Sequence, residues 1–134
     1  MKLSSKSLTA IKMFVDLGEH YEDGFISLID IAKRKDVSKK FLEQIVILYK
    51  KNGLIVGSRG NQGGYKLAKA PNQISLKDII EISESSLFEP QNEGILIKEI
   101  LKGMDQKIDD YFSSFTLSSL VEKQIASYSN SYCI

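Results

Sequence analysis

The first twenty residues place apolar side chains three or four positions apart. This spacing predicts a helix from Ser4 to Glu19. Gly18 and the polar stretch that follows it predict that the helix ends in a loop. We expect the buried face of this helix to comprise Leu8, Ile11, Phe14, Val15 and Leu17.

Two closely spaced helices follow, each preceded by a serine that can cap it. Ser27 and Asp30 form a capping pattern, which predicts a short helix ending near Lys35. Ser38 is the expected cap of a longer helix, and Gly53 supplies its left-handed stop. A short helix, a tight turn and a second capped helix are typical of a helix-turn-helix.

Residues 54–67 have the pattern of a β-hairpin. Leu54–Val56 and Tyr65–Leu67 predict two short strands, and the loop between them contains the stretch RGNQGGY. We expect the glycines of this loop to supply the positive φ angles that a tight hairpin requires. A helix-turn-helix followed directly by such a hairpin is a winged helix, in which this loop is the wing.

A further helix is predicted after the hairpin. Ser75 and Asp78 repeat the capping pattern, which predicts a helix to about Glu84 and then a loop. The chain therefore divides into a winged helix-turn-helix domain, residues 1–84, and a C-terminal part, residues 85–134. The predicted fold is mainly α with a small β-hairpin wing, which places it in the α+β class.

The C-terminal part is predicted to contain a long amphipathic helix over residues 93–115. Its apolar positions recur at heptad-like spacing, which suits a dimerisation helix; the alternative is a helix packed on its own domain. Thr116 is expected to cap a last helix, and residues 127–134 are expected to fray. The apolar stripe consists of Ile97, Leu101, Met104, Ile108, Tyr111 and Phe115.

Charge is unevenly distributed along the chain. Residues 33–69 contain ten lysines and arginines against two acids, a net charge of +8, whereas the remainder of the chain carries −7. A basic middle within an otherwise acidic protein favours a surface that binds a polyanion. The alternative is a lysine-rich surface that faces only solvent.

The sequence offers no constellation for an enzyme, a metal site or a membrane segment. It contains one histidine, His20, and one cysteine, Cys133, from which no catalytic dyad or metal cluster can be assembled. The glycine-rich loop matches neither G-x-x-x-x-G-K-S/T nor G-x-G-x-x-G. No apolar run reaches the ~20 residues of a membrane span, so we expect a cytoplasmic protein without cofactors.

The start of the second helix of the helix-turn-helix is the expected DNA-reading element. Lysine can contact phosphate or guanine, glutamine can pair with adenine, and glutamate can accept a hydrogen bond from cytosine. Arg59 is placed to enter the minor groove, where negative potential is concentrated. Glu43 has an alternative role as a helix-stabilising charge. The candidate DNA contacts are Ser38, Lys39, Lys40, Glu43, Gln44, Arg59, Asn61 and Lys66.

Three stretches of the chain resemble the Rrf2 family of bacterial transcription regulators. They are MKLSSKSLTAIKMFVDL, LIDIAKRKDVSKKFLEQIVILYKKNGLIVGSRGNQGGYKLAKAPNQISLKDIIE and TLSSLVEK, which together span nearly the whole chain. The resemblance implies a homodimer, joined through the long C-terminal helix, that binds palindromic double-stranded DNA at promoters; we expect a repressor. It also implies that Lys2 and Lys6 belong to a basic N-terminal segment that touches phosphate. The alternative is a winged helix that binds another protein without specific DNA binding.

One departure from the family pattern concerns cysteine. Members that bind an iron–sulfur cluster carry three cysteines before and at the start of the long helix, whereas residues 85–95 contain none here. The sequence therefore resembles the clusterless CymR type rather than the IscR and NsrR types, and we expect no cluster. Three effectors stay open: a small molecule beside Phe88, a protein partner, or a thiol switch at Cys133.

Overall fold

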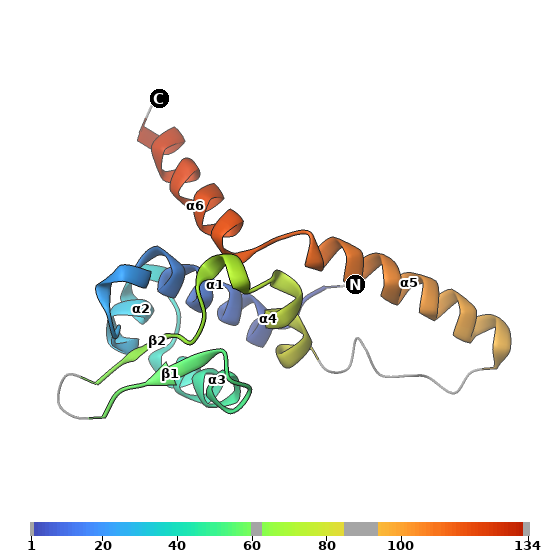
Figure 1. Ribbon diagram of the computed structural model, residues 1–134, viewed down its shortest axis with the longest axis horizontal. Helices are drawn as coiled ribbons and strands as arrows, with labels where there is room; N and C mark the ends of the chain where they lie inside the picture. The colour runs from blue at the N-terminus through green and yellow to red at the C-terminus, as the bar shows by residue number, and fades with distance from the viewer. Residues whose placement is uncertain (1, 60–62, 85–93, 133–134) are drawn as a thin grey trace.

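The computed structural model describes residues 2–59, 63–84 and 94–132. Four helices and a hairpin form a body from which two C-terminal helices extend in different directions (Figure 1). In chain order the elements are α1 (Ser5–Glu19), η1 (Tyr21–Asp23), α2 (Leu28–Lys35), α3 (Lys39–Lys51), β1 (Ile55–Gly57), β2 (Tyr65–Leu67), η2 (Pro71–Gln73), α4 (Leu76–Ser83), α5 (Ile95–Ser113) and α6 (Leu117–Tyr132).

Helix α1 begins and ends close to the predicted residues. The hydroxyl of Ser4 caps it by accepting a hydrogen bond from the Ser7 amide at 3.2 Å. Phe14, Val15 and Leu17 are buried as predicted. Leu8 is not, since 50% of it is exposed.

The predicted end of α1 at Glu19 is confirmed, but Gly18 itself does not terminate the helix. It lies inside the last turn, and a Cβ atom placed there would come within 2.7 Å of Val121 in α6. Gly18 is therefore explained by the close approach of α6 to α1 rather than by helix termination. No signal in the neighbouring sequence shows that contact, because Val121 is far away along the chain.

The helix-turn-helix forms as predicted. Ser27 accepts a hydrogen bond from the Asp30 amide and caps α2, and Ser38 caps α3 in the same way. The turn between the helices is closed by Asp36 in the left-handed conformation, with φ 52°. Gly53 has φ 77° immediately after α3, which confirms its predicted role as the left-handed stop.

The two predicted strands pair in antiparallel register, with Val56 opposite Lys66. Ile26 joins the far edge of β2 through two 2.8 Å hydrogen bonds with Tyr65, which form a single antiparallel bridge. A Cβ atom on Gly64 would lie 2.6 Å from the Ile26 carbonyl oxygen. Gly64 does not have a positive φ, so the prediction that it supplies one to the hairpin was wrong. Its lack of a side chain instead allows the bridge to Ile26 to form.

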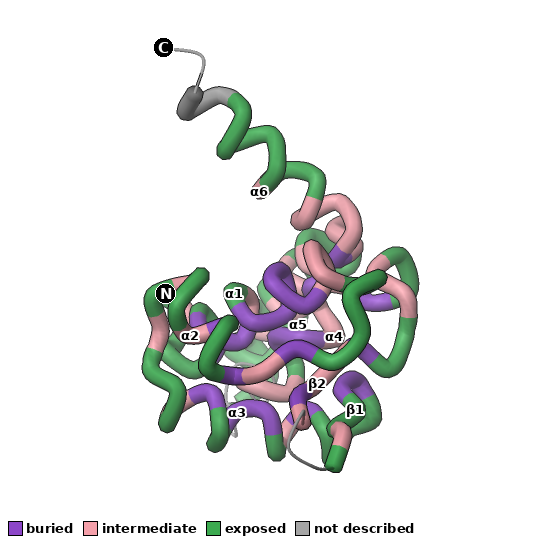
Figure 2. Tube along the Cα trace, turned by 90° about the vertical axis from the view of Figure 1, so that its left-hand side faces the viewer, coloured by how far each residue is buried: buried purple, intermediate pink, exposed green. Residues whose placement is uncertain are grey.

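The core is built mainly by α1 and α3, and α2, the hairpin, Ile79 of α4 and Leu117 of α6 pack against them (Figure 2). The rings of Phe14 and Tyr49 pack edge to face with their centroids 4.8 Å apart. The Tyr49 hydroxyl donates to the Ile79 carbonyl at 2.7 Å, and burial raises the pKa of Tyr49 to about 12. This contact fixes α3 to α4 through a buried, satisfied polar group.

The junction between the two C-terminal helices is fixed to the body. Thr116, just before α6, forms a bridge with Ser75, and its hydroxyl caps α6 by accepting from the Ser119 amide. Leu117 is fully buried, whereas no residue of α5 is. Helix α6 continues to Tyr132, so the prediction of fraying from Ser127 was wrong up to that residue. Within the described chain, none of the helices is long and apolar enough to cross a membrane.

Candidate nucleic-acid interface

One face of α3 is exposed along its whole length. Leu42, Ile45, Val46 and Tyr49 bury the opposite face in the core. Because a helix repeats every 3.6 residues, the positions between them must face outward. The predicted contacts Ser38, Lys39, Lys40, Glu43 and Gln44 are all exposed on this helix or at its cap.

Lys39 and Glu43 form an ion pair across one helical turn. Their charged atoms lie 3.3 Å apart, and each side chain is 51% exposed. A pair this exposed contributes a few tenths of a kcal/mol at most, on the order of 0.3–0.5. The ion pair therefore stabilises the helix only weakly. Breaking it costs little free energy, so Lys39 and Glu43 can each pair with a group on a ligand instead.

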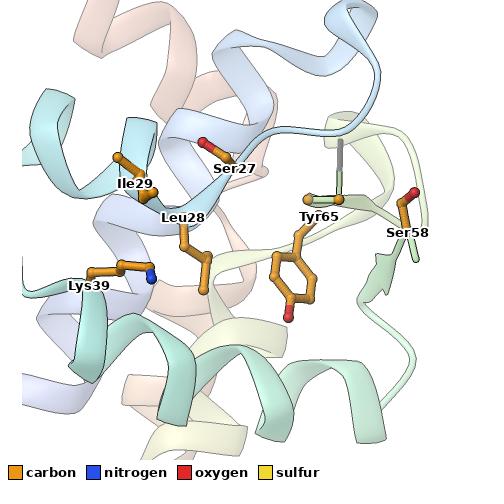
Figure 3. A pocket seen from close by; sticks show the side chains of 8 residues that line it. Ser27, Leu28, Ile29, Lys39, Ser58 and Tyr65 are labelled. Atoms are coloured by element: carbon orange, nitrogen blue, oxygen red, sulfur yellow. The ribbon is translucent and has the colours of Figure 1, made fainter. Parts of the chain in front are cut away.

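A groove lies where the start of α2, the start of α3 and the base of the wing converge (Figure 3). It encloses about 290 Å³, and in Figure 3 Lys39 points into it from α3 while Tyr65 enters from β2. Its walls combine hydroxyl groups with one ammonium group, which suits an anionic ligand. The labelled lining residues are Ser27, Leu28, Ile29, Lys39, Ser58 and Tyr65.

The residues of the wing that were predicted to contact DNA lie in different surroundings. Arg59 is exposed directly after the serine that lines the groove. Asn61 lies outside the described residues. Lys66 sits in a separate hollow with Tyr21 and Val56, and its ammonium lies 4.7 Å from the centre of the Phe25 ring. Lys66 is therefore not brought together with Lys39 or the groove.

The N-terminal segment approaches α3 from the other side. Lys2 and Lys6 are both exposed. Lys6 lines a hollow of about 340 Å³ together with Gln44 and Lys51, so one of the two N-terminal lysines lies beside the exposed face of α3.

A buried carboxylate holds this N-terminal segment in place. The Glu84 Oε1 atom accepts from the Ser4 amide at 2.6 Å and from the Ser7 hydroxyl at 2.7 Å. The hydrogen bonds from Ser4 outweigh the effect of burial and, with that from Ser7 and the charge of Lys6, hold the pKa of Glu84 below its ordinary value. The start of α1 is thereby fixed to the end of α4.

Two of the ten bases in the basic segment are used inside the fold. Arg34 pairs with the buried carboxylate of Asp16, and Lys35 donates to Glu19 at 2.7 Å and to the Tyr128 hydroxyl at 3.2 Å. Counting charge along the sequence treated both as available to a polyanion. Their partners lie in α1 and α6, so no local pattern could have shown that they are engaged.

Helix α5 exposes an apolar face wider than the predicted stripe. Ile97 and Met104 are each 40% exposed, and Ile100, which lies between them on the same face, is 51% exposed. Leu101 and Ile108 are half-buried on this face. Lys77 of α4 anchors the helix by an ion pair with Asp109 at 3.0 Å.

Of the last two residues of the predicted apolar stripe, one lies on α5 and the other lies beyond its end. Tyr111 lies on α5 and is 61% exposed, whereas Phe115 follows the end of the helix at Ser113. The Phe115 ring packs edge to face with Tyr111 at 5.1 Å and carries the Lys123 ammonium above it at 4.9 Å. Phe115 thus belongs to the junction between α5 and α6 rather than to the helix itself.

Potential metal ligands are scattered. The single histidine, His20, is bonded through Nδ1 to Asp23 at 2.8 Å. Over the described ranges, no group of three or more histidine, cysteine, aspartate or glutamate side chains is placed to hold a metal ion.

Comparison with known proteins identifies similar regulators over most of the chain. The transcriptional regulator IscR of Erwinia tasmaniensis is 30% identical over 133 residues, which cover 92% of this chain and 81% of that protein. The solved structure of T. potens IscR superposes with a TM-score of 0.80 at 32% identity and covers 92% of this chain and 88% of its own. CymR, the global cysteine regulator of B. subtilis, also superposes with a TM-score of 0.80, at 27% identity and with 92% and 98% covered.

These relatives are transcriptional regulators rather than enzymes, in agreement with the sequence interpretation. They include both IscR and CymR, so likeness alone does not separate the two types. The family model Rrf2, described as an iron-dependent transcriptional regulator, matches residues 3–123. With the winged helix and its exposed α3 in place, this match shows that the chain belongs to the Rrf2 family of transcriptional regulators.

Proposed function

We propose that the protein binds DNA in a sequence-specific manner and regulates transcription as a homodimer. One observation carries the proposal: the exposed polar face of α3 lies beside the wing that bears Arg59, and a groove with hydroxyl groups and Lys39 separates them. A helix of this kind fits the major groove while the wing reaches the neighbouring minor groove. The groove between them then faces the phosphodiester backbone.

The chemistry of each side chain suggests its role in such a complex. Lys39 and Lys40 can hold phosphates or guanine, and Gln44 can pair with adenine. Glu43 can accept a hydrogen bond from cytosine once Lys39 turns to a phosphate. Arg59 would enter the minor groove. The remaining candidates are Ser38 at the helix cap, Asn61 and Lys66 on the wing, and Lys2 and Lys6 as phosphate contacts.

The apolar face of α5 supports the homodimer. Apolar surface exposed on a monomer is stabilised when a second copy covers it, by roughly 25 cal/mol per Å² removed from water. Two copies related by a two-fold axis would present two α3 helices to two half-sites of a palindrome. Residues 1–84 would then form the DNA-binding domain, and residues 85–134 would supply the dimer contacts.

We further propose a cytoplasmic repressor that binds no iron–sulfur cluster. The 134 residues contain a single cysteine, which is too few thiolates to hold a cluster, so the chain fits the CymR type better than the IscR type. A dimer seated on a promoter would exclude the polymerase, which makes repression the simplest outcome. A small molecule or a protein partner would then be the effector.

Selection of genomic DNA fragments by the purified protein tests this function. We expect a palindromic consensus, and a salt titration of the best fragment should show log K falling by about 0.9 per phosphate neutralised for each unit of log salt. The same selection in cell extract supplies any effector that binding requires. Absence of enrichment in both conditions would refute DNA binding and favour a winged helix that binds another protein.

A further inference from the structure

Ile47 lies in the middle of the exposed face of α3. It is 65% exposed, and among the described large apolar side chains only Ile95 and Leu96 of α5 are more exposed. A large apolar side chain on a surface helix gains nothing from contact with water. Its position on this helix leaves it available to a ligand that would cover it.

The neighbours of Ile47 are the proposed DNA contacts. It follows Lys40 by seven residues and Glu43 by four, and it precedes Lys51 by four, so all of these share one face of the helix. The core positions Leu42 and Val46 lie on the other face. Ile47 thus stands one turn beyond the residues expected to read bases.

Charge around Ile47 favours DNA over an apolar protein surface. The hollow that Ile47 lines is formed by apolar side chains of α3, among them Phe41 and Leu48, together with Lys6, Gln44 and Lys51. Two ammonium groups beside an apolar side chain suit a ligand that carries phosphates around a small apolar feature. A protein partner would have to bury or neutralise both lysines to reach the same isoleucine.

The major groove offers a single apolar feature, the 5-methyl group of thymine. We infer that Ile47 is a specificity-determining residue that packs against the methyl group of a thymine. The inference rests on the proposed function, because it requires α3 to lie in the major groove. Lys40 and Lys51 would hold phosphates on either side of this contact, while Glu43 and Gln44 read neighbouring bases.

Replacement of single thymines by deoxyuridine tests the contact, because it removes one methyl group and keeps every base-pairing hydrogen bond. The duplex is the operator that the wild-type protein selects, and affinity is measured by fluorescence anisotropy. At one thymine of each half-site, the wild type should bind the deoxyuridine duplex about threefold to fivefold more weakly, as expected for one methyl group removed from water. Ile47→Ser should bind both duplexes equally, whereas Ile47→Val should keep part of the preference.

Ile125 provides the matched control. It is an isoleucine of α6 that is 51% exposed and lies on another element, so Ile125→Ser should keep the full preference for thymine. If the wild type binds every deoxyuridine duplex as tightly as the thymine duplex, the inference is wrong although the proposed function stands. The same holds if Ile47→Ser keeps the preference for thymine. A wild type that selects no operator would overturn the proposed function and this inference with it.

Discussion

Arg34 of α2 forms a two-point ion pair with Asp16 of α1. Its Nε atom lies 2.8 Å from Oδ1 and its terminal nitrogen 2.9 Å from Oδ2. The Asp16 side chain is 1% exposed and the Arg34 side chain 38%. The hydrogen bond to Asp16 raises the pKa of Arg34, so the pairing favours the charged guanidinium. This pair fixes the first helix of the helix-turn-helix to the body.

Removal of the guanidinium should destabilise the fold. Arg34→Ala leaves the Asp16 carboxylate buried without a partner, and we expect a loss of about 3 kcal/mol in the free energy of unfolding. This is the low end of the range for buried pairs, because water reaches part of Arg34. Urea unfolding measures it. Lys33→Ala, at the exposed base one residue earlier, should change stability by less than about 0.5 kcal/mol, and equal losses in both variants would contradict this prediction.

Glu84 should make stability depend on pH. Its folded pKa lies below the ordinary value of 4.5, so its contribution is fully present above that value and is lost as pH falls through the folded pKa. Glu84→Gln keeps an oxygen that can accept from Ser4 and Ser7 but carries no charge.

We therefore expect the wild type to exceed Glu84→Gln in unfolding free energy at pH 7, with the difference shrinking in acid. Thermal unfolding from pH 7 to pH 3 measures this difference. Lys6, whose charge acts on the carboxylate, is present in both proteins, so it does not account for a difference between them. A difference that stays constant with pH would refute the assignment.

Sequence patterns predicted correctly those features that depend only on residues close together along the chain. Ser38 and Gly53 bound α3 as predicted, since capping and left-handed stops involve residues within one turn. Contacts between distant residues were not predictable in this way. Gly18 faces Val121, and Gly64 faces Ile26, so each glycine was assigned a local role that its distant partner overrides.

The candidate interface shows the same division. The spacing of α3 placed Lys40 and Gln44 on the exposed face correctly, because core and surface alternate with the helical period. Arg34 was counted among the bases available to DNA although it is engaged with Asp16. Ile47 was passed over because an exposed isoleucine cannot be told from a buried one until the helix is packed.

Gly64→Ala should weaken the attachment of the wing. The new Cβ atom would meet the Ile26 carbonyl oxygen at 2.6 Å, and backbone atoms of both segments would have to move apart. Overpacking of this kind costs about 1–3 kcal/mol. Gly103→Ala, where nothing lies within 4 Å, is the control and should stabilise α5 by up to about 1 kcal/mol. Thermal unfolding measures both variants, and an unchanged midpoint for Gly64→Ala would show that the bridge is dispensable.

Arg59→Ala should weaken DNA binding and leave the fold intact. Arg59 is exposed on the wing, so its removal opens no cavity. We expect a loss on the order of 1–3 kcal/mol in binding free energy if the guanidinium reads bases in the minor groove. Fluorescence anisotropy on the selected operator measures the loss, and urea unfolding should give wild-type stability. An unchanged affinity would show that the wing does not contact DNA.

Glu43→Ala should alter the preferred DNA sequence more than the affinity for DNA.

An aspartate on the apolar face of α5 should separate the dimer. Met104 and Ile108 lie one turn apart on that face, and a carboxylate buried between two copies would lack a partner. We expect Met104→Asp and Ile108→Asp to sediment as monomers. Each should also lose most of its affinity for the palindrome, since a monomer contacts one half-site. Gln106→Asp places the same charge on the opposite, exposed side of the helix and should remain dimeric. If both variants on the apolar face stay dimeric, the two copies must associate through another surface.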